Sequence, residues 1–142
     1  MKVIEIKRFS KDLLDTLNDL LPQLSSSSIP LGEDRLLAVL HSDATHLLMA
    51  EENETFLGTL TLVVFTIPAG ILARIEDLVV QAAYRRRGVG QALVRKAINL
   101  AASRGADAVE LTAHPSRTAA LRLYDRLGFK ARETHVYRYR VR

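Results

Sequence analysis

The 142-residue chain is predicted to fold as an α/β domain with a mixed, mostly antiparallel sheet of six or seven strands and about four helices. Two observations predict this class. Segments with apolar residues at every second position alternate with segments whose apolar residues recur at spacings of three and four. In the second half, a helical segment also lies between two strand-like segments, which predicts a crossover and a parallel strand pair. One domain over 1–142 fits this length, and 48% apolar residues suffice for one core.

The first part of the chain predicts one strand and two helices. Residues 2–8 alternate in polarity, and Ser10 is a good N-cap for a helix that ends near Pro22. The serine run 25–28 is the one low-complexity segment, and we interpret it either as a mobile loop over a binding cleft or as a plain connector. A second short helix is expected over 32–42.

The middle of the chain predicts three consecutive strands and therefore an antiparallel meander. The strands are expected at 45–52, 56–66 and 71–81, with turns around Asn53 and at 68–70. After the glycine-rich segment that follows, residues 90–105 predict a helix that ends at Gly105, and residues 106–114 predict a strand. A last helix is expected over 116–128 with Ser116 at its cap, and residues 129–142 alternate as a final strand or pair.

The composition excludes several classes of protein. The absence of cysteine excludes a disulfide framework, a thiolate metal site and a cysteine nucleophile, and it fits a reducing compartment. The first ten residues lack an apolar signal core, and no run reaches the ~18 uncharged apolar residues that a membrane span needs. We therefore expect a soluble, cytoplasmic protein that does not bind a membrane.

The positive charge of the chain belongs to its second half. Five cationic and ten acidic side chains give residues 1–70 a net charge of −5, whereas fifteen and six give residues 71–142 a net charge of +9. Fifteen of the twenty cationic residues are arginine, whose guanidinium binds phosphate or carboxylate with two parallel hydrogen bonds. We expect an anionic ligand to bind in the second half.

The segment Arg85–Gly90, RRRGVG, lies between the end of a predicted strand and the first turn of a predicted helix. Two glycines allow a ligand to approach the backbone closely, and free N–H groups at a helix start attract anionic oxygens. The spacing matches neither the Walker A loop nor the dinucleotide-binding fingerprint. The hexamer therefore predicts a phosphate cradle, with a tight turn bearing solvated arginines as the alternative.

Two separated motifs resemble those of the GNAT superfamily of acyl-CoA-dependent N-acyltransferases. In LVVQAAYRRRGVGQALV, Arg85, Gly88 and Gly90 fill the positions of the motif Q/R-x-x-G-x-G/A. Downstream, AALRLYDRLGFK resembles the motif A-x-x-L-Y-x-x-x-G-F, with Tyr124 at its tyrosine. The resemblance covers residues 72–131 in detail and implies the GNAT fold, with acetyl-CoA as the acetyl donor.

The resemblance also implies which residues bind this cofactor. The pantetheine arm would pair with the backbone of the central strand at Leu78, Val79 and Val80. Backbone N–H groups would bind the pyrophosphate, and the residues concerned are Arg85, Arg86, Arg87, Gly88, Val89, Gly90 and Gln91. Many family members have an asparagine seven residues before the motif tyrosine, where this chain has Arg117. Arg117 would either reach the phosphates of CoA or lie exposed at the helix start.

The resemblance implies that Tyr124 is the general acid that protonates the departing CoA sulfur, the alternative being a tyrosine that fills the core. The candidate base is Glu76, because carboxylates on an apolar strand are costly to bury and indicate a wet cleft or a cationic partner. Alternation puts Glu76 on one side with Arg74, Leu78 and Val80, and Asp77 on the other with Ile75 and Val79, unless a bulge intervenes. The alternative for Glu76 is a structural pair with Arg74.

Asp77 and His114 are candidates for binding the acceptor, Asp77 through the ammonium group and His114 as a proton relay. No histidine spacing typical of a metal site is present, so no metal is expected. We expect an N-acetyltransferase that moves acetyl to a primary amine of a small molecule or peptide by direct attack, because the chain offers no cysteine and no recognisable serine nucleophile.

Two alternatives stay open, a basic nucleic-acid-binding or regulatory module and a catalytically silent CoA-binding domain. Nucleic acid is not the expected partner, because no nucleic-acid-binding motif is present. The protein is expected to be a monomer or a homodimer, since an exposed strand at 134–141 would be able to pair across a dimer.

Overall fold

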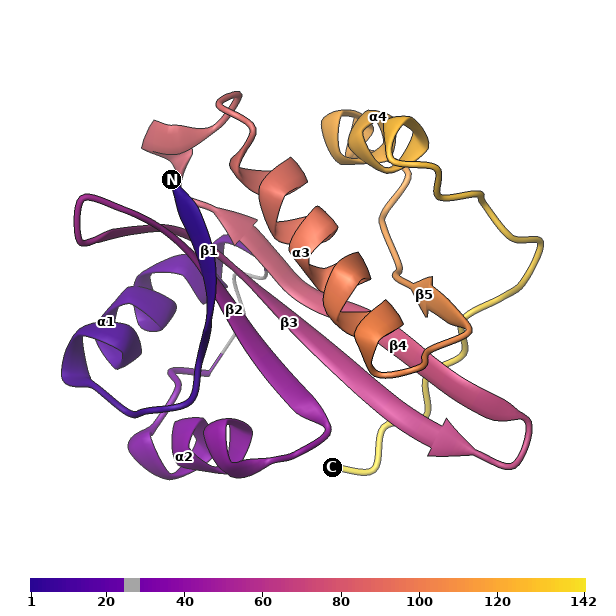
Figure 1. Ribbon diagram of the computed structural model, residues 1–142, viewed down its shortest axis with the longest axis horizontal. Helices are drawn as coiled ribbons and strands as arrows, with labels where there is room; N and C mark the ends of the chain where they lie inside the picture. Colours follow the sequence, from indigo (N-terminus) through magenta and orange to yellow (C-terminus); the bar gives the residue numbers. More distant parts are fainter. Residues whose placement is uncertain (25–28) are drawn as a thin grey trace. The chain divides into compact units, whose positions relative to one another are not determined.

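The computed structural model describes residues 1–24 and 29–142, which form two compact units, Met1–Thr112 and Ala113–Arg142. Our interpretation of the serine run 25–28 therefore lies outside the described residues. The first unit contains β1 (Lys2–Ile6), α1 (Lys11–Leu20), η1 (Leu21–Gln23), α2 (Glu33–His41), β2 (Thr45–Glu52), β3 (Thr55–Ile67), β4 (Gly70–Val80), η2 (Ala82–Tyr84), α3 (Val89–Ser103) and β5 (Ala108–Glu110) (Figure 1). The second unit contains α4 (Thr118–Arg126).

The first unit is built on a mixed sheet with the strand order β1-β2-β3-β4-β5. The strands β1 to β4 pair antiparallel in sequence order, which confirms the predicted meander. The helix α3 then returns the chain so that β5 pairs parallel with β4, between Leu72–Arg74 and Ala108–Glu110. The α/β class and the crossover are therefore confirmed.

The number of strands differs from the prediction. The described residues form five strands rather than six or seven, and β5 is only three residues long. Residues 129–142 form no strand, although they alternate in polarity. Val136, Tyr137, Tyr139 and Val141 are all more than three-quarters exposed. Alternation gives a segment the two faces of a strand, but a strand also needs a neighbouring strand for its backbone hydrogen bonds. No strand among the described residues lies beside this segment.

The helices α1 and α2 cover one face of the sheet. The hydroxyl of Ser10 accepts a hydrogen bond of 3.1 Å from the N–H of Leu13, as the predicted N-cap requires. Leu13 and Leu17 of α1 pack in one buried cluster with Leu36 and Leu40 of α2 and with Leu47 and Met49 of β2. Because side chains alternate along β2, Leu48 and its alternate neighbours His46 and Ala50 point to the opposite face.

The helix α3 covers that opposite face (Figure 1). Gly58 of β3 lies beneath it, and a Cβ at this position would lie 3.4 Å from Leu93 of α3 and 2.8 Å from the carbonyl oxygen of Val79. Glycine at position 58 therefore lets α3 and β4 approach the centre of the sheet. The first unit thus buries both faces of its sheet, and the segment that joins β4 to α3 emerges at one end of the central strands.

Candidate active site

The strand β4 contains one extra residue at the predicted acidic pair. Glu76 pairs with Thr61 of β3 and Val79 pairs with Thr59, so Asp77 and Leu78 both lie opposite the single residue Leu60. Asp77 has a φ of 52°, in the left-handed region that few non-glycine residues adopt. This geometry is that of a β-bulge, which interrupts the ladder and redirects side chains.

The bulge changes which side chains share a face. Glu76 and Arg74 lie on the same face, as expected, because they pair with Thr61 and Val63. The expectation that Leu78 and Val80 follow them on this face is wrong, because Val79 takes that place opposite Thr59 and Val80 pairs with Gly58 on the other face. For the same reason Ile75 and Val79 do not share a face with each other. The extra residue shifts the alternation by one position, and it leaves both Glu76 and Asp77 exposed between buried Ile75 and Val79.

The two carboxylates differ in their surroundings. Glu76 Oε1 lies 3.3 Å from the guanidinium of Arg74, and the two side chains are 48% and 38% exposed. The Arg74–Glu76 pair considered as an alternative is therefore present, with both side chains partly exposed. The pKa of Asp77 is raised above its usual value, first by partial burial of the carboxyl and second by the negative charge of Glu76. Asp77 thus holds a proton more readily than a free aspartate.

The outer edge of β4 is open beyond Arg74. The strand β5 pairs with β4 only over Leu72–Arg74, and no other described strand lies along that edge. The N–H of Gln81 donates to the carbonyl of Leu57 on β3 at 2.9 Å, so the neighbouring backbone groups of Val80 point the other way. The carbonyl of Val80 accepts a hydrogen bond of 3.2 Å from the side chain of Arg85. Within the first unit, no described strand lies along this edge at Leu78 and Val80, the backbone predicted to pair with pantetheine, whereas Val79 pairs with Thr59 of β3.

The loop after β4 presents free backbone N–H groups. Gly88 is the N-cap of α3 with a φ of 80°, and Arg86 has a φ of 64°. The N–H groups of Arg85 and Ala92 donate to the carbonyls of Ala82 and Gly88. Between them, no N–H group of residues 86–91 donates to an oxygen of any described residue. These six donors lie at and just before the N-terminus of a fifteen-residue helix, where the positive end of the helix dipole favours anionic groups.

The three arginines of this loop have different partners. Arg85 donates 2.9 Å to Oε1 of Gln23 in η1, in addition to its bond with Val80. Arg87 lies 3.4 Å from the carboxylate of Glu52 and 5.6 Å from the centre of the Tyr84 ring. Within 1–24 and 29–142, the side chain of Arg86 has no hydrogen-bond or ion-pair partner.

Sequence reasoning missed Gln23, Glu52 and Tyr84 as neighbours of this loop. Gln23 and Glu52 are 62 and 35 residues away from the arginines that they contact. No local pattern marks either of them, so only the tertiary fold reveals these contacts.

The second unit contains the other predicted site residues. Nδ1 of His114 accepts a 3.1 Å hydrogen bond from the N–H of Ser116 and lies 2.7 Å from its hydroxyl, so the imidazole is held against its own turn. The prediction that Ser116 caps the last helix is wrong, because the N-cap is Arg117 and no side chain bonds to the helix start. The hydroxyl of Ser116 is engaged by His114 instead.

Tyr124 lies on α4 and is half-buried. Its ring packs edge-on against Phe129 with ring centres 5.8 Å apart, and its carbonyl accepts the N–H of Phe129 at 3.0 Å. Burial raises the pKa of the Tyr124 phenol above its usual value of 10.0, although the positive charge of Arg117 acts in the opposite direction. The phenol is therefore protonated at neutral pH, as a proton donor must be.

The structure thus gathers the predicted residues into two groups, one in each unit. Glu76 to Val80 and Arg85 to Gln91 belong to the first, and His114, Arg117 and Tyr124 belong to the second. The described residues contain no group of three or more His, Asp or Glu side chains placed to hold a metal ion. Among them there is also no helix with the length and apolar character to cross a membrane.

Comparison with known sequences finds relatives named as acetyltransferases. Residues 12–129 match the acetyltransferase (GNAT) family. An uncharacterized N-acetyltransferase of Methanocaldococcus jannaschii is 40% identical over 62 residues, which are 44% of this chain and 27% of that protein. Human N-alpha-acetyltransferase 30 is 40% identical over 65 residues, which are 46% of this chain and 18% of that protein. The matched segment therefore spans about a quarter or less of these relatives.

Solved structures share the fold over nearly the whole chain. A putative acetyltransferase from Agrobacterium tumefaciens superposes with a TM-score of 0.87 at 24% identity, covering 99% of this chain and 100% of that one. An aminoglycoside N-acetyltransferase in complex with CoA superposes with a TM-score of 0.79 at 17% identity, covering 99% and 94%. With the strand-to-helix loop and the order of elements described above, the family match over 12–129 shows that this chain belongs to the GNAT acetyltransferase family.

Proposed function

We propose that the chain transfers the acetyl group of acetyl-CoA to a primary amine by direct attack within a ternary complex. The observation that carries the proposal is the succession of two backbone surfaces, the edge of β4 at 78–80 along which no described strand lies and the free N–H groups of 86–91. They follow each other along the chain, as the parts of one extended ligand with a pantetheine arm and a pyrophosphate require. The solved relative in complex with CoA supports this choice of cofactor.

In this proposal the backbone holds the cofactor. Leu78, Val79 and Val80 pair with the amides of the pantetheine arm as a further strand would. The N–H groups from Arg86 to Gln91 bind the pyrophosphate, and the charges of Arg85, Arg86, Arg87 and Arg117 add steering.

The chemistry needs a base, a stabilised oxyanion and an acid. Glu76 removes a proton from the acceptor ammonium, directly or through a water molecule, so that the amine nitrogen attacks the thioester carbonyl. The C–N bond forms and the C–S bond then breaks. Tyr124 gives its proton to the CoA thiolate, and the second proton of the attacking nitrogen passes through solvent to restore the phenol, so that a neutral amide and the CoA thiol result. No acetyl-enzyme is required, because the chain contains no cysteine.

The proposed acceptor is a small molecule or a peptide that enters as an ammonium ion. The names of similar proteins fit both classes, since one is an N-alpha-acetyltransferase and a solved structure of the same fold is an aminoglycoside N-acetyltransferase. The exposed carboxylates of Glu76 and Asp77 form an anionic surface for such a cation, with Asp77 as the group that binds it. His114 is a further candidate for contact with the acceptor.

Isothermal titration with acetyl-CoA tests the cofactor site. We expect saturable binding that Gly88→Val weakens at least tenfold, because a β-branched residue is strained at a φ of 80° and would shift the backbone N–H groups of the loop. Gly32→Ala is a matched control, because the space around Gly32 is open and its φ is negative. The absence of any binding by the unmodified protein would overturn the proposal.

A thiol-release assay over amino acids, polyamines, aminoglycosides and peptides then tests the reaction. Turnover with at least one amine is expected. CoA binding without turnover on this panel would identify a silent CoA-binding domain. Binding to DNA that weakens steeply with salt, without CoA affinity, would identify the nucleic-acid-binding alternative.

A further inference from the structure

The β2–β3 hairpin places a carboxylate beside the loop that we propose binds the cofactor phosphates. Glu52 is the last residue of β2 and pairs with Thr55, so only Asn53 and Glu54 form the turn. Their φ angles of 51° and 64° are both positive, as a tight two-residue turn of type I′ requires. The position of Glu52 is therefore fixed by the hairpin rather than by its own side-chain contacts.

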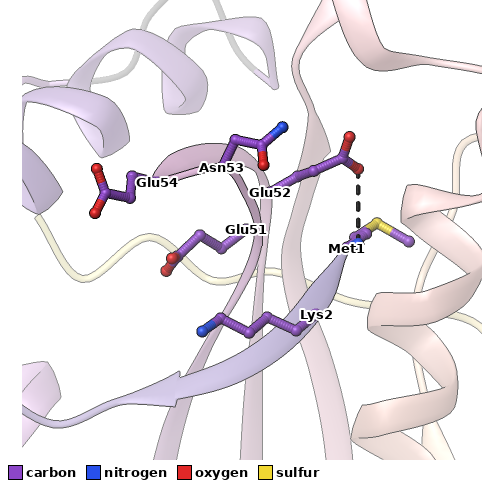
Figure 2. A pocket seen from close by; sticks show the side chains of 6 residues that line it. All are labelled: Met1, Lys2, Glu51, Glu52, Asn53 and Glu54. Atoms are coloured by element: carbon purple, nitrogen blue, oxygen red, sulfur yellow. Dashed lines mark ion pairs between the residues drawn. The ribbon is translucent and has the colours of Figure 1, made fainter.

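The side chain of Glu52 differs from its acidic neighbours in direction. Glu51, Glu52 and Glu54 line an open pocket of about 380 Å³ together with Met1, Lys2 and Asn53. Figure 2 shows the carboxylate of Glu52 directed toward Met1 and away from the carboxylates of Glu51 and Glu54. Its Oε2 lies 3.7 Å from the ammonium of Met1, and its Oε1 lies 3.4 Å from the guanidinium of Arg87.

Arg87 is thereby held from two sides, by Glu52 and by the ring of Tyr84. It belongs to the same loop whose N–H groups at 86–91 are free for an anion. The negative charge of Glu52 offsets the positive charge of Arg87 next to this loop. An anion that reaches the Arg87 guanidinium must share it with Glu52 or displace Glu52.

We propose that Glu52 is an affinity-setting residue that competes with the phosphates of CoA for Arg87. The inference rests on the proposed function, since it assumes that CoA binds to this loop. Removal of the Glu52 charge frees Arg87 for the phosphates and strengthens CoA binding. In the unmodified protein, Glu52 weakens the hold on CoA and so favours its release after transfer.

The test compares Glu52→Gln with Glu54→Gln by titration with CoA. Glu54 lies on the same turn, so the control removes an equal charge without touching Arg87. We expect Glu52→Gln to lower the Kd of CoA about threefold at low salt, since an exposed pair is worth about 0–1 kcal/mol. Glu54→Gln should give less than half of this effect. A Kd that is unchanged or raised in Glu52→Gln, or equal effects of the two variants, would overturn the inference.

Two further measurements test whether the gain in CoA affinity depends on Arg87 and on the phosphates of CoA. In an Arg87→Gln background, Glu52→Gln should no longer strengthen CoA binding, because the contested cation is gone. Pantetheine, which lacks the phosphates, should bind the unmodified protein and Glu52→Gln alike. An equal gain for pantetheine would show a change in the strand edge instead, and would contradict competition for Arg87.

The outcomes separate this inference from the proposed function. If the unmodified protein does not bind CoA, the proposed function fails and the inference fails with it. If it binds CoA and Glu52→Gln has no effect, only the inference fails. Circular dichroism melts confirm that each variant is folded, and Glu52→Ala is a second variant that removes the same charge.

Discussion

The guanidinium of Arg74 lies 3.3 Å from Oε1 of Glu76, and the register of β4 places both side chains on one face of the sheet. Both are substantially exposed, so the pair contributes only about 0–1 kcal/mol to folding. Loss of either residue should leave the fold intact. The pair therefore allows a structural role of Glu76 to be separated from a catalytic one.

Glu76→Gln should lower kcat about 10²-fold, the scale of a lost general base, while the Kd of acetyl-CoA stays the same. Arg74→Gln is the matched control, because it breaks the same ion pair and keeps the carboxylate. It should retain most of the activity in the thiol-release assay. Equal losses in the two variants would mean that Glu76 acts only as the partner of Arg74.

Asp77→Asn should make the protein slightly more stable at neutral pH. Partial burial and the charge of Glu76 raise the pKa of Asp77, so ionisation of this carboxyl disfavours the folded state. Below its usual pKa of 3.8 the group is protonated in both states, and the cost appears as the pH rises through the folded pKa. Asparagine also tolerates a φ of 52°.

Thermal melts of Asp77→Asn at several pH values test whether the variant is more stable than the unmodified protein and how the difference depends on pH. The gain over the unmodified protein should be no more than about 0.5 kcal/mol near pH 7, because the side chain is partly solvated, and it should vanish near pH 3. A variant that is less stable near pH 7 would show that the carboxylate makes a favourable contact instead.

Tyr124→Phe should keep the fold and lose turnover. Phenylalanine retains the edge-on packing with Phe129, and only the hydroxyl is removed. We expect kcat to fall about 10²-fold with the Kd of acetyl-CoA unchanged. Tyr137→Phe is the control, since that tyrosine is 89% exposed.

Because burial raises the pKa of Tyr124, its ionisation should not lower kcat between about pH 7 and 9. Full activity of Tyr124→Phe would exclude the acid role.

The sequence alone predicted the features of the fold that depend on a local pattern of residues. The Ser10 cap, the meander and the crossover through α3 follow from periodicity and turn residues, and the loop at 85–90 follows from its glycines. The position of the bulge at Asp77 could not be predicted from the apolar–polar pattern. A bulge changes which side chains share a face, but nothing in the residue types of the strand marks where it occurs. Contacts such as Arg87 with Glu52 join residues far apart in sequence, and the tail 129–142 has a strand pattern without a strand partner.

The last prediction concerns His46, which is 1% exposed on the α3 face of the sheet. Its Nδ1 lies 2.8 Å from Oε2 of Glu5, which also lies 3.0 Å from the ammonium of Lys7. Burial acts to raise the pKa of Glu5, but the hydrogen bonds and positive charges of His46 and Lys7 outweigh it and hold the pKa below its ordinary value of 4.5. Nε2 of His46 has no partner among the described residues, so the bond to Glu5 is the one polar contact of this buried ring there.

Glu5→Gln should therefore destabilise the protein near pH 7 by about 1.5–3 kcal/mol, the value of a hydrogen bond to a charged group. Because the folded pKa of Glu5 is depressed, its contribution is present above pH 4.5 and is lost as the pH falls through the folded pKa. The melting temperatures of Glu5→Gln and the unmodified protein should thus converge near pH 3. Lys7→Gln, which removes only an exposed partner of Glu5, should change stability by less than about 1 kcal/mol. If Glu5→Gln melts like the unmodified protein near pH 7, the buried ring does not depend on this carboxylate.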